Sequence, residues 1–323
     1  MDSFSKIPLS AEQAQKIVTS HFGTGSRLRS FEELKEGFFN AAALLELEDG
    51  FRCVMKAAPP DDVRVKRYEK NLMKAEVEAM RLVHQRTPVP VPEIYIYDTS
   101  RRFVKSDFFL MEALPGIPLN KVRKQMPLET QRAIERSMGR MTREMSEITN
   151  EAFGYWVQPE PPQTSWCDCF VRMLGRVLQD GLDMNVDLGQ PYEALFQQLE
   201  RHLGVLDAVQ TPRLVHWDLW DGNIFVDPKS GQVTGLVDFE RVMWADPLME
   251  AIFGKPVATS AFAEGFGGGV FQDASQVTRR RLYNVYLDLI MIIECYFRKY
   301  PTNNQENWAR GLLQEELQRL SEI

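Results

Sequence analysis

The sequence contains few cysteines, no long hydrophobic run and no excess of basic charge. Its four cysteines are scattered, and the one Cys-x-Cys pair, Cys167 and Cys169, has no histidine or second pair beside it. This pattern argues against a disulfide framework or a zinc site and favours reduced thiols packed in the interior. The net charge of -7 argues against a general nucleic-acid-binding surface.

Apolar stretches are also too short to cross a bilayer. The most apolar one, Leu289–Ile293, is bounded by Asp288 and Glu294, whereas a spanning helix needs about 20 apolar residues. The first residues are polar and lack the apolar core of a secretion signal. We therefore expect a cytoplasmic globular protein without membrane contact, and 323 residues suffice for one large domain or two lobes.

The negative charge is concentrated in the C-terminal part. Residues 1–118 contain 17 acidic and 17 basic residues, whereas residues 119–323 contain 28 acidic and 21 basic residues. The ordinary interpretation is a solvated acidic face. The alternative is a field that attracts a cationic substrate.

Residues 1–115 carry the pattern of a small antiparallel sheet with one helix, preceded by a short helix over 10–21. The expected order is three strands, the helix and two strands, over residues 26–34, 41–47, 51–57, 71–85, 94–97 and 108–113. The break Leu114–Pro118 marks the expected boundary between an N-terminal nucleotide-binding lobe, 1–115, and a C-terminal catalytic and acceptor-binding lobe, 116–323.

Helical periodicity dominates beyond this boundary. The expected helices cover residues 128–149, 166–180, 191–203, 261–266, 279–300 and 304–321. Three short strands interrupt them, over 213–215, 224–226 and 233–237, and Asp227–Gly231 forms a hairpin turn between the last two. The sequence therefore predicts an α+β, bilobal protein.

Polar residues gather in the loop between the first two of these short strands. The loop contains His216-x-Asp218 and Asn223, and Asp238 follows the third strand. Phosphoryl transfer from ATP needs one carboxylate beside the attacking hydroxyl and oxygen ligands for Mg²⁺. We assign Asp218 as the catalytic base and Asn223 and Asp238 as the metal ligands. The alternative is a polar loop whose Asp and Asn side chains cap turns.

The first lobe offers an independent test of this ATP-dependent phosphoryl-transfer hypothesis. A kinase of this type needs a lysine on the third strand and a glutamate on the following helix, and Lys56 lies on that strand. Glu76 shares a helix face with Met80 and Val83, so it is the preferred partner, with Glu78 as the alternative. Taken alone, Lys56 is better explained as an ordinary edge-strand lysine, but the motif of the second lobe favours the catalytic interpretation.

The apolar segment 108–116 fits an adenine-binding hinge. It reaches the expected lobe boundary, where backbone groups can pair with the edge of adenine. The expected groups are the carbonyl of Glu112 and the N–H of Leu114.

Together these residues resemble the aminoglycoside phosphotransferase family, relatives of the protein kinases that phosphorylate small molecules. The likeness extends from about Phe31 to Phe253 and includes Lys56, Glu76 and the segments VPVPEIY, FLMEALPG, HWDLWDGNIFVD and GLVDFE. It implies a two-lobe protein-kinase-like fold, MgATP as donor and transfer of the γ-phosphate to a hydroxyl. We expect a small-molecule acceptor with a hydroxyl group, of cationic character in view of the acidic C-terminal part, and a monomer or a homodimer.

The sequence departs from the family in two places. Trp217 replaces the usual glycine, so we expect a bulkier catalytic loop near the acceptor. The turn that begins at Gly37 has a single glycine, and we expect it to cover the phosphates through backbone N–H groups near Phe39 and Asn40.

Three further features carry expectations of their own. Asp246 matches a family aspartate that is expected to brace the catalytic loop. Residues 153–166 look like an insertion over the acceptor site, whose aromatics either line a pocket or pack. Arg241 contacts the acceptor or phosphate, or forms a surface ion pair.

The predicted function is ATP- and Mg²⁺-dependent phosphorylation of a small molecule, an aminoglycoside or another cationic amino alcohol. One alternative is a metabolic kinase of a sugar, an amino acid or a choline-like substrate. A catalytically inactive nucleotide-binding relative is disfavoured because Lys56, Asp218, Asn223 and Asp238 are all present. A protein kinase is disfavoured because no long activation segment follows Asp238.

Overall fold

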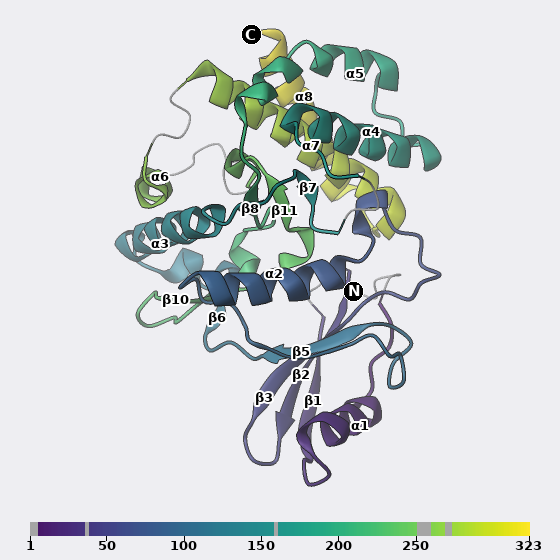
Figure 1. Cartoon of the computed structure of the whole chain (residues 1–323), viewed down its shortest axis with the longest axis vertical. Helices are drawn as coiled ribbons and strands as arrows, with labels where there is room; N and C mark the ends of the chain where they lie inside the picture. Colours follow the sequence, from purple (N-terminus) through teal and green to yellow (C-terminus); the bar gives the residue numbers. More distant parts are fainter. Residues whose placement is uncertain (1–5, 36–38, 158–160, 251–259, 269–272) are drawn as a thin grey trace.

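The computed structural model describes residues 6–35, 39–157, 161–250, 260–268 and 273–323. Figure 1 shows a sheet-bearing part at one end of the molecule and a helical part at the other. The expected strands and helices of both parts are confirmed, with ends that mostly shift by one to three residues.

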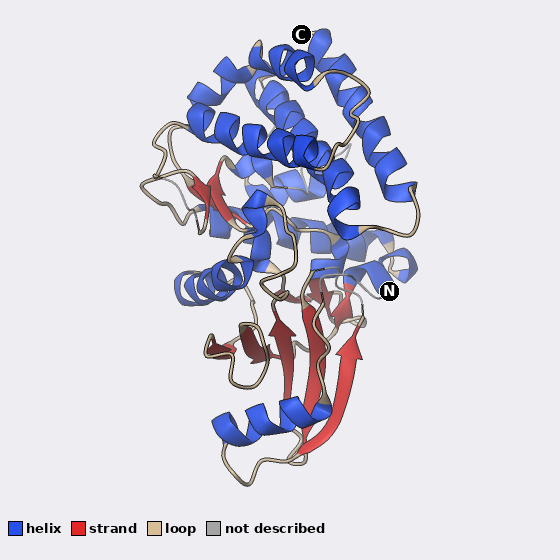
Figure 2. Cartoon of the chain, turned by 90° about the vertical axis from the view of Figure 1, so that its right-hand side faces the viewer, coloured by secondary structure: helices blue, strands red, loops and turns tan. Residues whose placement is uncertain are grey.

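The N-terminal sheet is antiparallel, with the strand order β1-β2-β3-β5-β4. Its strands are β1 (Leu28–Leu34), β2 (Ala41–Leu47), β3 (Arg52–Ala57), β4 (Ile94–Asp98) and β5 (Phe108–Glu112). Alternation along the strands separates two apolar faces. Phe108 and Leu110 pack in the cluster that contains α1 (Ala11–Phe22), and Phe109 and Met111 pack in the cluster that contains α2 (Leu72–Arg86). Helix α2 consequently lies between the sheet and the helical part (Figure 1), and Figure 2 shows these two parts at opposite ends of the molecule from another side.

The helical part is built around α7 (Ala274–Arg298), whose residues Leu289–Ile293 are almost all buried. Its other helices are α3 (Leu128–Ser146), α4 (Trp166–Asp183), α5 (Tyr192–Glu200), α6 (Ser260–Phe266) and α8 (Asn304–Ser321). Helix α7 starts five residues before the expected position because Asp273 caps it, accepting a hydrogen bond from the N–H of Gln276. Among the described helices, none has the length and apolarity that crossing a membrane requires.

Short 3₁₀ helices connect the longer elements. They are η1 (Arg67–Glu69), η2 (Leu119–Lys121), η3 (Arg123–Gln125), η4 (Leu203–Ala208), η5 (Asp221–Asn223), η6 (Phe239–Arg241) and η7 (Pro247–Met249). The helix expected over 191–203 ends at Glu200, and η4 follows it. Such short turns leave little periodicity in a sequence, so tertiary packing determines them.

Two small sheets hold the polar loops. They are β10-β9-β6 and β7-β11-β8. Their strands are β6 (Ile117–Pro118), β7 (Gly154–Tyr155), β8 (Arg213–Val215), β9 (Ile224–Val226), β10 (Val233–Leu236) and β11 (Met243–Ala245). The hairpin of β9 and β10 was expected. Strands β6, β7 and β11 were not expected, and each is formed by pairing with a strand distant in the sequence.

A glycine joins the two parts. Gly116 has φ +95°, and a Cβ at this position would lie 2.4 Å from the carbonyl oxygen of Val226. Only glycine tolerates both the backbone conformation and this approach. The chain can therefore pass from β5 to β6 and pair with β9.

The segment between β3 and α2, residues 58–71, docks on the helical part, and we call it the strap. Lys66 Nζ lies 2.5 Å from an oxygen of Glu294. Arg298 reaches back to Glu69, also at 2.5 Å. The strap thus connects the sheet-bearing part to helix α7 by charge pairs that are largely buried.

Candidate active site

The loop 216–223 begins with a buried histidine that anchors it. His216 Nδ1 accepts a hydrogen bond from the N–H of Asp218 (3.2 Å), so Nε2 carries the proton and donates it to the carbonyl of Val237 (3.0 Å). Burial lowers the pKa of His216 to about 4, and the ring is therefore neutral. It packs on Phe239, with 4.2 Å between ring centroids. His216 ties the loop to the segment after β10.

Asp218 is held in place by its own loop. The side-chain amide of Asn223 donates hydrogen bonds to the carbonyl of Asp218 (2.9 Å) and to its Oδ2 (3.2 Å). Burial raises the pKa of Asp218 to about 7, while the nearby charge of Arg241 acts in the opposite direction. A positioned carboxylate with this proton affinity is suited to accept the proton of a hydroxyl group.

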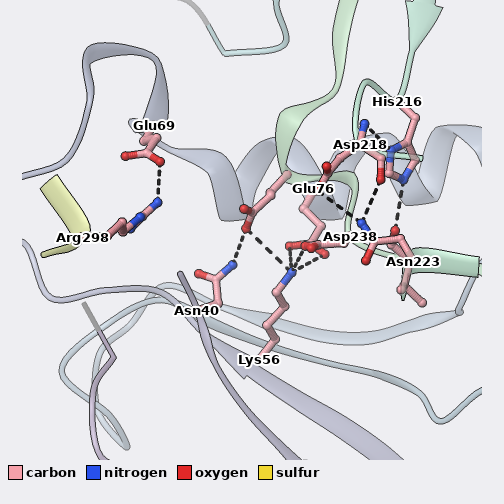
Figure 3. A network of polar contacts seen from close by, with 11 residues as sticks. Asn40, Lys56, Glu69, Glu76, His216, Asp218, Asn223, Asp238 and Arg298 are labelled. Carbon is pink, nitrogen blue, oxygen red and sulfur yellow. Dashed lines mark hydrogen bonds and ion pairs between the residues drawn. The ribbon is translucent and has the colours of Figure 1, made fainter. Parts of the chain in front are cut away.

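Lys56 lies between carboxylates from both parts of the chain (Figure 3). Its Nζ is 2.8 Å from both oxygens of Glu76 on α2 and 2.5 Å from Oδ1 of Asp238. Burial opposes the charged form, but Asp238, Glu76 and Glu240 outweigh it and raise the pKa of Lys56. The ammonium group is therefore permanently charged at the meeting point of the two parts.

The preference for Glu76 over Glu78 as the partner of Lys56 is confirmed. Glu76 is fully buried on the inner face of α2. Glu78 instead accepts a hydrogen bond from the indole N–H of Trp156, at 2.8 Å. The helical period of α2 explains the difference, since two residues correspond to a rotation of about 200°.

The donor set around Asp238 fits a magnesium ion. Carboxylate oxygens of Glu76, Asp238 and Glu240 lie within 4.8 Å of one another. Asn223 turns its amide nitrogen to Asp218, which directs the amide oxygen away from that carboxylate. Oxygen donors of this kind suit Mg²⁺. The assignment of Asn223 and Asp238 as metal ligands stays a prediction.

Glu240, which was not among the predicted site residues, belongs to the same cluster. Glu240 is buried. Burial is the larger cause, and the charge of Asp238 the second, of the rise in its pKa to about 8. Asn40 donates a hydrogen bond to it, at 2.7 Å, and Lys56 lies 3.9 Å away. Its place directly after Asp-Phe was a usable signal, because the preceding aspartate was expected to face the metal site.

The turn expected to cover the phosphates is only partly described, since Glu36–Phe38 lie outside the described residues. Phe39 is buried beneath the guanidinium of Arg298, which lies 4.5 Å from the ring centroid. Asn40 reaches Glu240 with its side chain. Both residues therefore bridge from the start of β2 to the helical part, and their contact with phosphates stays a prediction.

The expected hinge lies where the two parts of the chain meet. Glu112 ends β5, and its N–H donates to the carbonyl of Glu93. The side chain of Leu114 packs so closely on Gly235 in β10 that an added Cβ there would lie 2.4 Å from Leu114 Cδ1. Contact of Glu112 and Leu114 with adenine stays a prediction.

Two expectations about the catalytic loop need correction. Glu250, not Asp246, braces the loop: its carboxylate accepts hydrogen bonds from the N–H of Trp217 (3.0 Å) and Leu219 (3.4 Å). Asp246 instead binds side chains of α7, Arg279 among them. Trp217 is fully buried, so its bulk lies inside the helical part rather than beside an acceptor. Chain spacing alone does not reveal which of two nearby carboxylates turns toward a loop.

Arg241 is not a surface residue, which excludes the surface ion pair. Its side chain is 17% exposed, and its guanidinium lies 3.3 Å from Glu294 and over the ring of Trp217. The charge of Asp218 is among those that raise its pKa, against the effect of burial. Arg241 is thus a permanent cation close to the predicted base.

The aromatics of the 153–166 segment mostly pack. Phe153, Tyr155 and Trp166 are buried, and the hydroxyl groups of Tyr155 and Tyr286 are 2.6 Å apart. The packing interpretation is therefore confirmed for these three. Trp156 is only partly buried and connects to α2 through Glu78.

Comparison with known proteins gives a family and a fold. A model of the phosphotransferase enzyme family matches residues 30–283. A probable ketoamine kinase of Vibrio cholerae serotype O1 is 26% identical over 224 residues, which cover 66% of this chain and 71% of that protein.

Solved structures share the fold at low sequence identity. A fructosamine-3-kinase candidate from Thermobifida fusca has a TM-score of 0.68 at 18% identity and covers 97% of this chain and 100% of its own. A thermostable mutant of aminoglycoside phosphotransferase APH(4)-Ia, in complex with AMP-PNP and hygromycin B, has a TM-score of 0.68 at 16% identity, with 95% and 98% covered. The expected protein-kinase-like fold with two lobes is confirmed.

Proposed function

The chain belongs to the phosphotransferase enzyme family, and we propose that it transfers the γ-phosphate of ATP to a hydroxyl group of a small molecule. The convergence of Lys56 with Asp238 carries the proposal, because these groups come from opposite parts of the chain. Asp218 lies in the adjoining loop: Asn223 donates a hydrogen bond to its Oδ2, and the carbonyl of Asn223 accepts one from the N–H of Val237, the residue before Asp238. Phosphoryl transfer requires mainly positioning and charge from a protein, and these residues supply both.

The reaction uses Asp218 to accept the proton of the acceptor hydroxyl. The hydroxyl oxygen forms a bond to the γ-phosphorus while the bond to the oxygen that bridges to the β-phosphate breaks, and ADP leaves with that electron pair. Lys56, held by Glu76, offsets charge on the phosphates. Arg241 offsets charge that develops beside Asp218.

The nucleotide and the metal are held by the residues predicted from the sequence. The carbonyl of Glu112 and the N–H of Leu114 pair with adenine, and backbone N–H groups near Phe39 and Asn40 contact the phosphates. Asn223 and Asp238 are the ligands proposed for Mg²⁺. When bound, this ion neutralises charge on phosphate oxygens.

For the acceptor we propose a ketoamine, a sugar derivative that carries an amine. The probable ketoamine kinase of Vibrio cholerae supports this class, since it is similar over two thirds of the chain. Such a molecule has hydroxyl groups and a cationic nitrogen, which agrees with the acidic C-terminal part. Aminoglycosides are the second candidate, because a structure of that class shares the fold.

The decisive experiment combines a screen of acceptors with one isosteric variant. ADP formation from ATP is measured with ketoamines, aminoglycosides, sugars and choline-like amino alcohols. With the best acceptor, Asp218→Asn is expected to lower kcat about 10²- to 10⁴-fold, because the amide accepts no proton. Asp207→Asn makes the same change at an exposed position and is expected to leave kcat unaltered.

Nucleotide binding to Asp218→Asn, measured by calorimetry, is expected to persist. Transfer at the wild-type rate by this variant excludes Asp218 as the base. Nucleotide binding by the wild-type protein without transfer to any acceptor supports the inactive relative instead.

A further inference from the structure

Helix α2 is held from two sides. On its inner face, Glu76 pairs with Lys56 at 2.8 Å. On another face, Glu78 accepts the indole N–H of Trp156 at 2.8 Å. The first contact lies in the predicted nucleotide site, and the second is made to a residue of the helical part. Besides the buried apolar residues of α2, these two polar contacts bear on its orientation and so on the position of Glu76.

Helix α2 has little local reinforcement at its start. Its N-cap residue, Asn71, has φ 58° and makes no side-chain capping bond, and the first turn carries no acidic residue. Caps and acidic residues in the first turn normally stabilise this end of a helix. Tertiary contacts must consequently fix where α2 lies.

Trp156 is itself rigidly held. Its ring stacks on that of Trp244 in β11, with 5.1 Å between centroids and 22° between planes. The backbone N–H of Trp156 donates to the carbonyl of Val242 (3.4 Å). Trp156 also directly follows β7, which pairs with β11. Strand β11 also pairs with β8, the strand that leads into His216. The indole N–H is thus presented by the same small sheet that carries the catalytic loop.

We propose that Trp156 is a positioning residue that holds α2, through Glu78, where Glu76 meets Lys56. The contact acts as a latch between the sheet of the catalytic loop and the helix that organises the phosphate-binding lysine. Its expected effect is on nucleotide binding, because Lys56 and Glu76 lie in the nucleotide site. This inference rests on the proposed kinase function, although the latch itself can be measured without it.

A competing contact of Glu78 provides the control. Lys74 Nζ lies 3.9 Å from Glu78 Oε1, and the two side chains are 53% and 44% exposed. Exposed pairs of this kind contribute little, because solvent screens them. Lys74→Ala therefore removes a contact of Glu78 without touching Trp156 and is expected to change nothing measurable in nucleotide binding.

Four variants test the latch. Trp156→Phe keeps a ring that stacks on Trp244 but loses the N–H, and Glu78→Ala loses the acceptor. Each is expected to raise the nucleotide Kd and KM about 3- to 10-fold, the effect of one hydrogen bond. The double variant is expected to match the single ones, since both break the same contact. Glu78→Gln keeps an acceptor oxygen and is expected to restore near-normal values, which a purely structural loss does not explain.

Hydrogen exchange separates failure of this inference from failure of the proposed function. In Trp156→Phe, amides of α2 (Leu72–Arg86) are expected to exchange faster, while those of α8 keep their protection. Unchanged exchange in α2, or additive effects in the double variant, overturns the latch. Absence of nucleotide binding by the wild-type protein overturns the proposed function, and exchange in α2 then still decides whether the latch exists.

Discussion

Trp217 combines a backbone conformation that favours glycine with complete burial. Its φ is 65°, and its ring stacks on Tyr286, with centroids 5.6 Å apart. Tyr68 and Tyr155 meet its edges. A left-handed conformation costs a side chain of this type about 1–2 kcal/mol. Loss of a buried tryptophan costs about 3–5 kcal/mol. Packing therefore outweighs strain at the residue before the predicted base.

Trp217→Gly is consequently expected to destabilise the protein, although it restores the residue usual in the family. The net loss is about 2 kcal/mol or more, since relief of strain offsets only part of the cavity. Urea unfolding followed by far-ultraviolet circular dichroism measures it without relying on tryptophan.

Asn185→Gly is the matched control for Trp217. Asn185 has φ 53° but is exposed, so its replacement leaves no cavity and is expected to change stability by less than about 0.5 kcal/mol. A Trp217→Gly protein as stable as the wild type contradicts the argument from packing.

Helix α7 carries two buried carboxyl groups whose pKa values are shifted in opposite directions. Glu294 lies among Lys66, Arg241 and Arg298, and these cations lower its pKa against the effect of burial. Asp288 is 4% exposed, and its Oδ2 has no hydrogen-bond partner. Burial, with Glu316 nearby, raises the pKa of Asp288 to about 8. One helix thus holds one carboxylate and one carboxylic acid at neutral pH.

Asp288→Asn is expected to stabilise the protein, increasingly as the pH rises. The unfolded chain loses the Asp288 proton near pH 4, whereas the folded chain keeps it to about pH 8. Between these two pH values the folded chain holds a proton on Asp288 that the unfolded chain has lost. The free energy of unfolding therefore falls as the pH rises from 4 to 8, and the contribution of Asp288 to it is constant above pH 8.

The difference in Tm between Asp288→Asn and the wild type, measured from pH 4 to pH 9, tests this. It is expected to grow up to about pH 8 and then to level off. Asp207→Asn, at an exposed position, is expected to show no such trend. A constant difference across the range means that Asp288 is ionised in the folded protein.

Across the whole molecule, the two parts are linked by buried charge as well as by the chain. The strap pairs Lys66 with Glu294 and Glu69 with Arg298. Lys56 adds a contact to Asp238 in the candidate site. Removing one partner of such a buried ion pair leaves the other charge buried without compensation, which is strongly unfavourable. Separation of the two parts is therefore costly.

The two parts are expected to unfold in one cooperative transition. All six tryptophans lie beyond residue 118, so their fluorescence follows mainly the helical part. Hydrogen exchange of the amides in β2 and β3 follows the sheet. The two probes are expected to give the same free energy of unfolding. Earlier opening of β2 and β3 means that the strap does not couple the parts.

Local patterns in the sequence were sufficient for much of the fold and part of the site. Alternation and helical periodicity depend on near neighbours in the chain, so they predicted the five-stranded sheet and the longer helices. The same periodicity predicted that Glu76, not Glu78, faces Lys56. The spacing of His216, Asp218, Asn223 and Asp238 predicted which residues gather around one loop.

Only the tertiary structure decided which groups face one another across long distances in the chain. Glu250 rather than Asp246 braces the catalytic loop, Trp156 reaches α2, and the strap docks on α7. Periodicity assigns a side chain to a face of its own element, but it carries no information about the element that packs there. The sequence by itself thus determined the elements and their chemical groups. Packing, which brings together residues as far apart as Lys66 and Glu294, determined their partners.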